Sequence, residues 1–145
     1  MTRDELKAQL HSYLDLKAEH RQLCKEIERI EAAMAAPKGA QLDGMPRSPG
    51  AGDPVLQAVT QHLALLERYQ AQVAQLAAAQ TEVEDMIEKL DSLERRLMRH
   101  RYIEGLEWEA VCVAISYSWR QTHNIHARAL DQLLALQEGA DNGQH

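Results

Sequence analysis

The chain has 145 residues, a formal net charge of −6 and a pI near 5.6. A protein held to nucleic acid by its bulk charge would be basic, so any DNA contact must be confined to one segment. Hydrophobic residues make up 45% of the chain, aromatic residues only 4%, and phenylalanine is absent. Because strands favour aromatic and β-branched side chains, a core of Leu, Ile, Val, Met and Ala predicts an all-α fold.

Residues 1–36 are expected to form one long coiled-coil helix. Thr2 and Glu5 have the spacing of a capping box, in which each side chain bonds the backbone N–H of the other residue. Pro37 ends the helical pattern. Apolar or semi-apolar residues recur every three or four positions and predict a heptad seam along one face. This seam comprises Leu6, Leu10, Tyr13, Leu16, His20, Leu23, Ile27, Ile30 and Met34.

Residues 37–53 are predicted to be a linker rather than a helix or a strand. All four prolines of the chain lie in or beside this stretch, together with four of its seven glycines. Such a composition breaks regular structure and buries little surface. The Met45–Asp53 motif, MPRSPGAGD, lies here, and the residues offer no physical reason to choose between a docking motif and a plain loop.

Residues 54–90 are expected to form a second long helix, with Asp53 as N-cap and Pro54 at the first helical position. A helix of this length cannot bury its apolar stripe alone and needs a partner helix. The partner is either residues 1–36, folded back antiparallel as a helical hairpin, or a second chain in a homodimer. The predicted seam comprises Val59, Leu63, Leu66, Gln70, Val73, Leu76, Gln80, Val83, Ile87 and Leu90.

The pattern changes near Leu90. Asp91 and Glu94 again have capping-box spacing, so either a new helix begins here or the long helix continues to about Ile103. Gly105 supplies the next break.

Residues 91–137 as a whole predict a small helix-turn-helix module. A short helix over Trp108–Ile115 is followed by a tight turn and by Ser118, a good N-cap. The last helix runs from Trp119 to about Gln137, and residues 138–145 are a predicted disordered tail.

A helix-turn-helix binds DNA by placing the first residues of its second helix at base edges in the major groove. Arg, Gln and Asn are the side chains that recognise guanine and adenine there, and residues 117–130 contain no acidic residue. The predicted base-reading residues are Trp119, Arg120, Gln121, His123 and Asn124. The predicted phosphate contacts are Arg95, Arg99, Arg101, Ser118 and Arg128.

The sequence LERRLMRHRYIEGLEWEAVCVAISYSWRQTHNIHARALDQL, residues 93–133, resembles region 4 of bacterial sigma factors. The resemblance covers about a third of the chain and implies a promoter-binding module that also touches RNA polymerase. The base-reading positions of that family fall on Trp119, Arg120, His123 and Asn124, with Gln121 nearby. Two departures are structural: Ser116 replaces the glycine of the turn, and Thr122 occupies a position that is ordinarily apolar and buried.

Nearly the whole chain resembles a family of small phage and prophage proteins related to the ArpU- and RinA-type regulators of late transcription. The order of features carries this resemblance: a heptad helix, the MPRSPG motif, a long helix and a sigma-like terminus. The resemblance implies a DNA-binding transcriptional regulator. The alternatives are a phage DNA-packaging protein of the small terminase type and a coiled-coil adaptor that binds no DNA.

Other classes of function find no support in the sequence. No phosphate-binding loop, catalytic triad or metal-ligand spacing is recognisable, so no enzyme activity, catalytic residue, metal or cofactor is expected. The N-terminus lacks the apolar stretch of a signal peptide, and no apolar run is long enough to span a membrane. Double-stranded DNA is the expected partner, and the cytoplasm of a bacterial host is the expected location.

Overall fold

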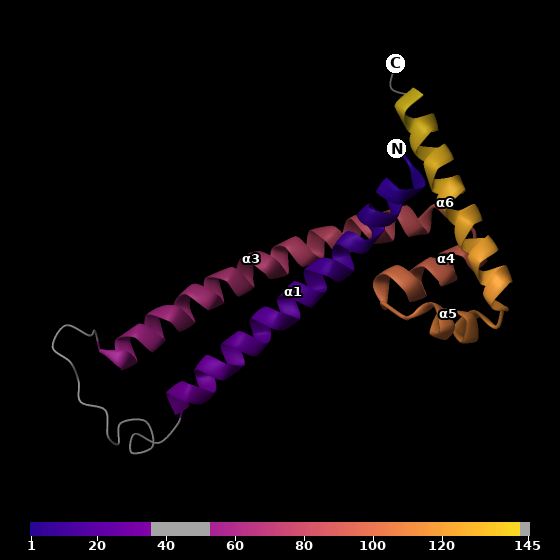
Figure 1. The fold of residues 1–145 in the computed structure, drawn as a ribbon. Helices are drawn as coiled ribbons and strands as arrows, with labels where there is room; N and C mark the ends of the chain where they lie inside the picture. Colours follow the sequence, from indigo (N-terminus) through magenta and orange to yellow (C-terminus); the bar gives the residue numbers. More distant parts are fainter. Residues whose placement is uncertain (36–52, 143–145) are drawn as a thin grey trace. The chain divides into compact units, whose positions relative to one another are not determined.

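The computed structural model describes residues 1–35 and 53–142, with side chains as far as residue 140. These residues form an all-α structure, and no strand occurs among them (Figure 1). The predicted fold class is therefore confirmed. The predicted linker over residues 37–53, with its Met45–Asp53 motif, lies outside the described residues except for Asp53. The helical elements are α1 (Arg3–Ala35), α3 (Pro54–Glu88), α4 (Ser92–Met98), the π-helical turn η1 (Arg99–Ile103), α5 (Trp108–Ile115) and α6 (Trp119–Asn142).

Both long helices begin at the predicted caps. The backbone N–H of Glu5 donates to the Thr2 hydroxyl at 3.2 Å, and the N–H of Thr2 donates to the Glu5 carboxylate at 3.3 Å. At the start of α3, the N–H of Val55 donates to the Asp53 carboxylate at 3.0 Å. These bonds satisfy N–H groups that have no partner inside the helix, which is why helices start at these residues.

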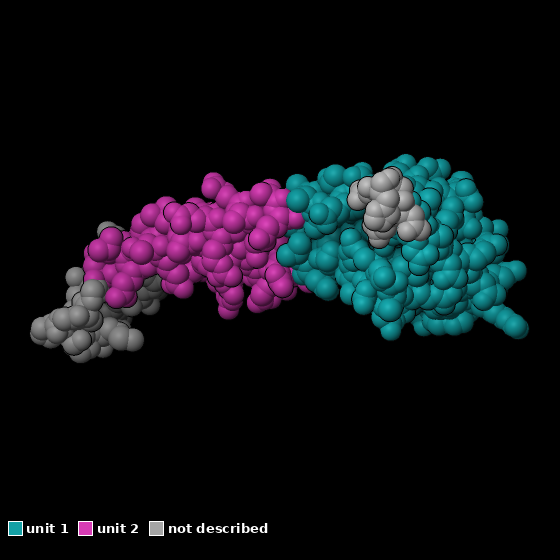
Figure 2. All heavy atoms as spheres, turned by 90° about the horizontal axis from the view of Figure 1, so that it is seen from above, with its two compact units in different colours: residues 1–17, 76–145 teal, residues 18–75 magenta. Residues whose placement is uncertain are grey.

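The chain divides into two compact units, shown in teal and magenta in Figure 2. Unit 1 consists of Met1–Lys17 and Leu76–His145, and unit 2 consists of Ala18–Gln75. Helices α1 and α3 each contribute to both units. Unit 1 contains the whole helix-turn-helix module, so it is the unit that positions the candidate site.

Unit 2 is an antiparallel pair formed by the adjoining parts of α1 and α3. Near the start of this part of α1, His20 bonds Gln72 at 3.0 Å; near its end, Glu31 bonds His62 at 3.1 Å. Leu23, Ile27 and Leu65 form the buried cluster of this unit. The heptad seam predicted for α1 is confirmed from Leu6 to Ile30, since its members there are buried or partly buried.

The seam predicted for α3 is partly wrong in its first half, where Val59 and Leu66 are partly buried but the other three members are exposed. From Leu76 onward its members are buried or partly buried, as expected. Before that point, Leu63 and Val73 are 56% and 44% exposed, and Gln70 is also exposed. The side of α3 that packs in unit 2 carries Leu65 instead, flanked by the polar residues His62 and Gln72. Counting apolar residues alone selected the wrong face because the packed face includes these polar side chains.

The main core lies in unit 1 and joins six helical segments, including η1 through Tyr102. It buries residues from the first turns of α1, the last turns of α3, and α4, α5 and α6. Its buried members include Leu6, Leu10, Val83, Ile87, Leu97, Met98, Tyr102, Val111, Ile125, Ala129 and Leu133. At the edge of this core, Arg3 donates two hydrogen bonds to the Asp131 carboxylate at 2.8 and 2.6 Å. The start of α1 is thereby bound to α6.

The chain breaks between α3 and α4, which settles the alternative left open near Leu90. The last turn of α3 tightens, and the N–H of Leu90 bonds the carbonyl of Ile87 at 3.0 Å. Asp91 then serves as N-cap of α4, but its side chain makes no capping bond. The capping box predicted for Asp91 and Glu94 is therefore wrong: the Glu94 carboxylate is nearly buried and lies 3.4 Å from the Arg128 guanidinium of α6.

Gly105 makes the turn that separates η1 from α5. Its φ is +74°, in the left-handed region that favours glycine. A Cβ at this position would also lie 3.3 Å from a methyl carbon of Leu14, so both the backbone and the packing favour glycine. Beyond the helix-turn-helix, α6 continues to Asn142 and passes the predicted end at Gln137.

Candidate nucleic-acid interface

Helices α5 and α6 and the turn between them form a helix-turn-helix. Helix α5 covers Trp108–Ile115, the residues predicted for it, and ends at Ser116. Ser116 adopts a left-handed conformation, with φ 62° and ψ 42°. This conformation lets the N–H groups of Ser116 and Tyr117 bond the carbonyls of Val113 and Cys112 at 3.2 and 3.1 Å. These bonds close α5 and direct the chain into α6.

We expect Ser116→Gly to stabilise unit 1 by about 0.5–1 kcal/mol, because glycine adopts this conformation without a Cβ clash. Both tryptophans of the chain, Trp108 and Trp119, lie in unit 1, so their fluorescence during urea unfolding reports on this unit. A lower midpoint in the variant would show that the serine side chain contributes more than its backbone strain removes.

A complete capping box begins α6. The backbone N–H of Gln121 donates to the Ser118 hydroxyl at 3.2 Å, while the N–H and hydroxyl of Ser118 donate to the side-chain oxygen Oε1 of Gln121 at 3.2 and 3.1 Å. The predicted N-cap is confirmed. The side chain of Gln121 thus holds the start of the helix, and only its NH₂ group remains for a base.

The first two turns of α6 present two polar side chains that make no hydrogen bond or ion pair with other described residues. Arg120 and Asn124 are exposed. Within the ranges that the structure describes, neither side chain makes a hydrogen bond or an ion pair. Neither needs to leave a protein partner in order to contact a ligand, and the first turn contains no acidic residue.

The two tryptophans of this surface and His123 form an aromatic cluster with tilted rings. The His123 ring lies 4.5 Å from the Trp108 ring and 4.5 Å from the Trp119 ring, measured between centroids. Trp119 remains 54% exposed, whereas His123 is half-buried and its Nε2 is buried without a partner. In this geometry the His123 ring supports the Trp119 ring, and Trp119 is the residue of this cluster that a ligand can reach.

Thr122 lies under this surface. It is fully buried, and its hydroxyl has no hydrogen-bond partner among the described residues. Burial of an unpaired hydroxyl is unfavourable, which agrees with the expectation that this position is ordinarily apolar.

Thr122→Val keeps the shape of the side chain and removes the unpaired hydroxyl. We expect it to raise the free energy of unfolding of unit 1 by about 1 kcal/mol. Urea unfolding followed by tryptophan fluorescence measures this change, with Thr122→Ser as the comparison that keeps the hydroxyl. A destabilised valine variant would mean that the hydroxyl has a partner, such as a buried water.

The arginines predicted to contact phosphate all have partners within the protein. Arg95 pairs with Glu88 at 3.4 Å, Arg99 with Glu84 at 3.7 Å, and Arg128 with Glu94 at 3.4 Å. The pairs of Arg95 and Arg99 lie at the surface, where a pair is worth about 0–1 kcal/mol, so a phosphate can compete for these two side chains. Arg128 is held more firmly, because its release would leave the nearly buried Glu94 carboxylate without this partner.

Arg101 differs from the other three arginines. Its guanidinium donates to the Leu106 carbonyl at 2.9 Å and lies 4.8 Å from the Trp108 ring. Because it joins η1 to the loop and to α5, its contacts are those of a structural residue.

A buried polar pair between η1 and α6 was not predicted from the sequence. The Tyr102 hydroxyl lies 2.7 Å from Nε2 of His126, and the two residues are 1% and 8% exposed. Burial lowers the pKa of His126 from 6.5 to about 4 and raises the pKa of Tyr102 to about 12. Both side chains are therefore neutral near pH 7. The partners are separated by 24 residues, so no local spacing indicated the pair.

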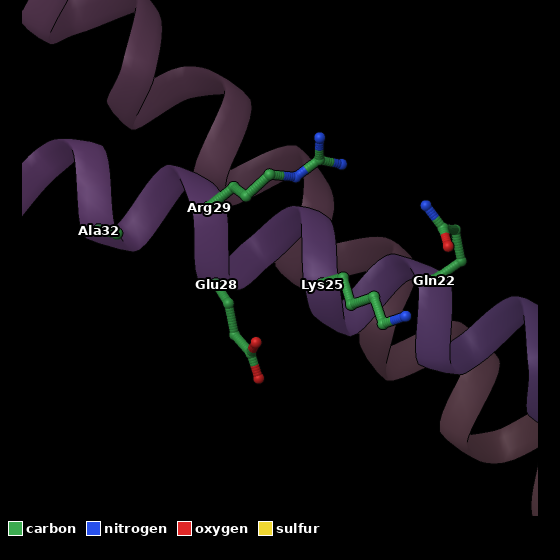
Figure 3. A pocket seen from close by; sticks show the side chains of 5 residues that line it. All are labelled: Gln22, Lys25, Glu28, Arg29 and Ala32. Atoms are coloured by element: carbon green, nitrogen blue, oxygen red, sulfur yellow. The ribbon is translucent and has the colours of Figure 1, made fainter.

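Small-molecule and metal sites have weak support in the described residues. A depression on α1 is lined by Gln22, Lys25, Glu28, Arg29 and Ala32, and Figure 3 shows that these residues extend outward from a single helix. A ligand there would have no enclosing wall. No group of three potential metal-ligating side chains occurs within residues 1–35 and 53–142. None of the helices in those ranges is long and apolar enough to cross a membrane.

The fold and this surface define an all-α protein that carries a helix-turn-helix. Comparison with known proteins finds no family model, no curated protein and no solved structure that matches this chain. Function is therefore inferred from the residues of the site.

Proposed function

We propose that this protein is a sequence-specific DNA-binding transcriptional regulator of the phage type, with α6 as its base-reading helix. One observation carries the proposal: the first two turns of α6 expose Arg120 and Asn124, side chains of the types that read bases. Neither has a hydrogen bond or ion pair to the described residues, and residues 117–130 contain no acidic residue. Arginine bonds two acceptors of guanine in the major groove, and asparagine bonds the donor and acceptor of adenine.

The rest of the surface suits the same geometry. A helix N-terminus attracts phosphate, and Ser118 and its neighbours lie at that end of α6. Trp119, supported by His123, offers a large apolar surface for a thymine methyl group or a sugar. The opposite face of α6 is held by the core through Ile125, Ala129 and Leu133, so the reading residues have a rigid base.

Charge predicts that one module binds DNA weakly. Residues 88–137 contain seven basic and seven acidic residues, and the chain as a whole is at −6. Few phosphate contacts give a small electrostatic contribution to affinity. A second DNA-binding module or a larger partner would compensate, and the resemblance to sigma region 4 makes RNA polymerase the partner to test.

Selection from a random pool of DNA duplexes tests this function. The purified chain is incubated with the pool at moderate salt, with and without bacterial RNA polymerase, and the retained duplexes are sequenced. We expect enrichment of a short motif that includes a guanine and an adenine position. Retention of DNA without any enriched motif, or no retention under either condition, would contradict sequence-specific binding.

A further inference from the structure

Helix α3 carries a second apolar surface that the described residues, 1–35 and 53–142, leave uncovered. We define the outer stripe as Leu56, Val59, Leu63, Leu66, Gln70 and Val73, all in unit 2. Leu56, Leu63 and Val73 are 62%, 56% and 44% exposed, whereas Val59 and Leu66 are partly buried. The spacing alternates three and four residues, which is the repeat of a coiled-coil seam. From Val59 to Val73 its members belong to the seam that the sequence predicted as the packed face. In unit 2, however, α1 packs mainly against the side of α3 that carries Leu65, with Leu66 at the edge of that contact.

The charge around the outer stripe is unlike that of a face exposed to water. Between Pro54 and Thr81 the only formally charged residues are Glu67 and Arg68. The exposed face of α1 in the same unit carries Arg21, Lys25, Glu28 and Arg29. Depletion of charge at an exposed apolar surface is typical of the centre of a protein interface. The stripe has no cation to hold DNA phosphates, so its partner is a protein.

The pattern of the stripe also specifies the kind of protein. A seam with three–four spacing packs against a helix that has the same spacing. Gln70 lies among the apolar members, and an amide pairs with another amide because it both donates and accepts. The partner must therefore present a heptad seam that is free of charge and carries an amide, and α3 of a second copy does so. A net charge of −6 opposes self-association at a charged face, whereas the segment 54–81 is neutral overall.

The small size of the buried cluster in unit 2 is consistent with a further helix that packs against this unit. Three buried apolar side chains, Leu23, Ile27 and Leu65, form its cluster, and Leu66 packs against them. Leu66 also belongs to the outer stripe, so a helix docked there would extend this core without interruption. Two such hairpins would give a four-helix bundle, a common solution for helices that cannot bury their stripes in pairs.

We propose that the outer stripe is the face through which a second copy of this chain docks, giving a homodimer built on α3. The stripe is about 26 Å long at 1.5 Å per residue, which is short for a coiled coil, so the dissociation constant is expected in the micromolar range. This proposal does not depend on DNA binding.

Sedimentation equilibrium of the full chain across the micromolar range tests the proposal. The wild type should be dimeric, and Leu56→Glu combined with Leu63→Glu should raise the dimer dissociation constant at least about 100-fold, because the glutamates would be buried without partners. The matched control is Ala64→Glu combined with Ala71→Glu, which adds the same charge at exposed residues of α3 outside the stripe and should leave the dimer intact.

Folding of the variants is checked by circular dichroism and by tryptophan fluorescence, which reports on unit 1. If the double glutamate variant loses helix, Val73→Lys replaces it. Val73 is exposed, and a lysine at this position is long enough to keep its charge in water. A monomeric wild type would overturn the proposal, including the case in which residues 36–52 of the same chain cover the stripe. A wild-type dimer that survives the stripe substitutions, or a ring of many copies, would overturn it as well.

Discussion

Replacement of Arg120 and Asn124 together by alanine is expected to lower the affinity for a selected duplex by about 100-fold or more. A well-placed pair between one of these side chains and a base contributes about 1–3 kcal/mol, and the two act at different base pairs. Both side chains are exposed and unengaged, so the substitutions should change the free energy of unfolding by less than about 0.5 kcal/mol. Fluorescence anisotropy with labelled duplex at fixed salt measures the affinity.

The matched control is Gln22→Ala combined with Arg29→Ala in α1. It also removes one arginine and one amide from exposed positions, and it changes the net charge by the same amount. If charge alone holds the DNA, the two double variants lose affinity equally, and direct reading by α6 is wrong. If α6 reads bases, the control should bind within about threefold of the wild type, a loss that corresponds to weak, long-range electrostatics.

Acidification from pH 6.5 to pH 4 is expected to destabilise unit 1 by about 3 kcal/mol through His126. Burial holds the pKa of His126 in the folded chain near 4, below its ordinary value of 6.5. The unfolded chain therefore takes up the proton first as the pH falls. The contribution of His126 to stability is complete above pH 6.5 and is lost progressively between pH 6.5 and pH 4.

Urea unfolding followed by tryptophan fluorescence across this pH range tests the prediction. His126→Leu removes the titrating group. The free energy of unfolding of this variant should therefore fall less steeply with decreasing pH than that of the wild type, whatever its value at neutral pH. His11, whose pKa burial also lowers, leaves a residual slope in the same direction. Identical slopes for the wild type and His126→Leu would show that His126 is not the group that titrates.

Most of the helical framework follows from local signals in the sequence. Helix starts are marked by residues that suit the first turn: capping side chains bond its free N–H groups, and a proline ring already has the helical φ. These residues are Thr2 with Glu5, Asp53 with Pro54, and Ser118. The helix over Trp108–Ile115 was predicted with the bounds that the structure has. These features depend on a few neighbouring residues, so the sequence alone is sufficient to find them.

Features that depend on residues far apart in the chain could not be predicted in this way. Glu94 has the spacing of a capping residue, but it pairs with Arg128 of α6. Tyr102 and His126 meet only because the core brings η1 and α6 together. The face of α3 that meets α1 in unit 2 could not be predicted, because it carries the polar side chains of His62 and Gln72 beside Leu65, whereas the more continuous apolar stripe lies to one side of it.

Only part of the candidate site could be predicted from the sequence. The sequence predicted Trp119–Asn124 as the base-reading group, but it could not show that Gln121 is used as a cap or that His123 packs between Trp108 and Trp119. It also could not separate Arg101, which holds a loop, from the arginines in surface pairs. Within the predicted group, Arg120 and Asn124 are exposed and have no hydrogen bond or ion pair to the described residues, and Trp119 beside them is exposed.

The most direct test of base reading by α6 combines Asn124→Ala with single base-pair changes in the selected duplex. At the base pair where Asn124 reads an adenine, a change of base pair should lower the DNA affinity of the wild type about tenfold or more and leave the affinity of the variant unchanged. Changes at the other positions of the motif should weaken both proteins alike. If Asn124→Ala suffers the same loss as the wild type at every position, α6 does not read bases through this residue, and the account of the site is wrong.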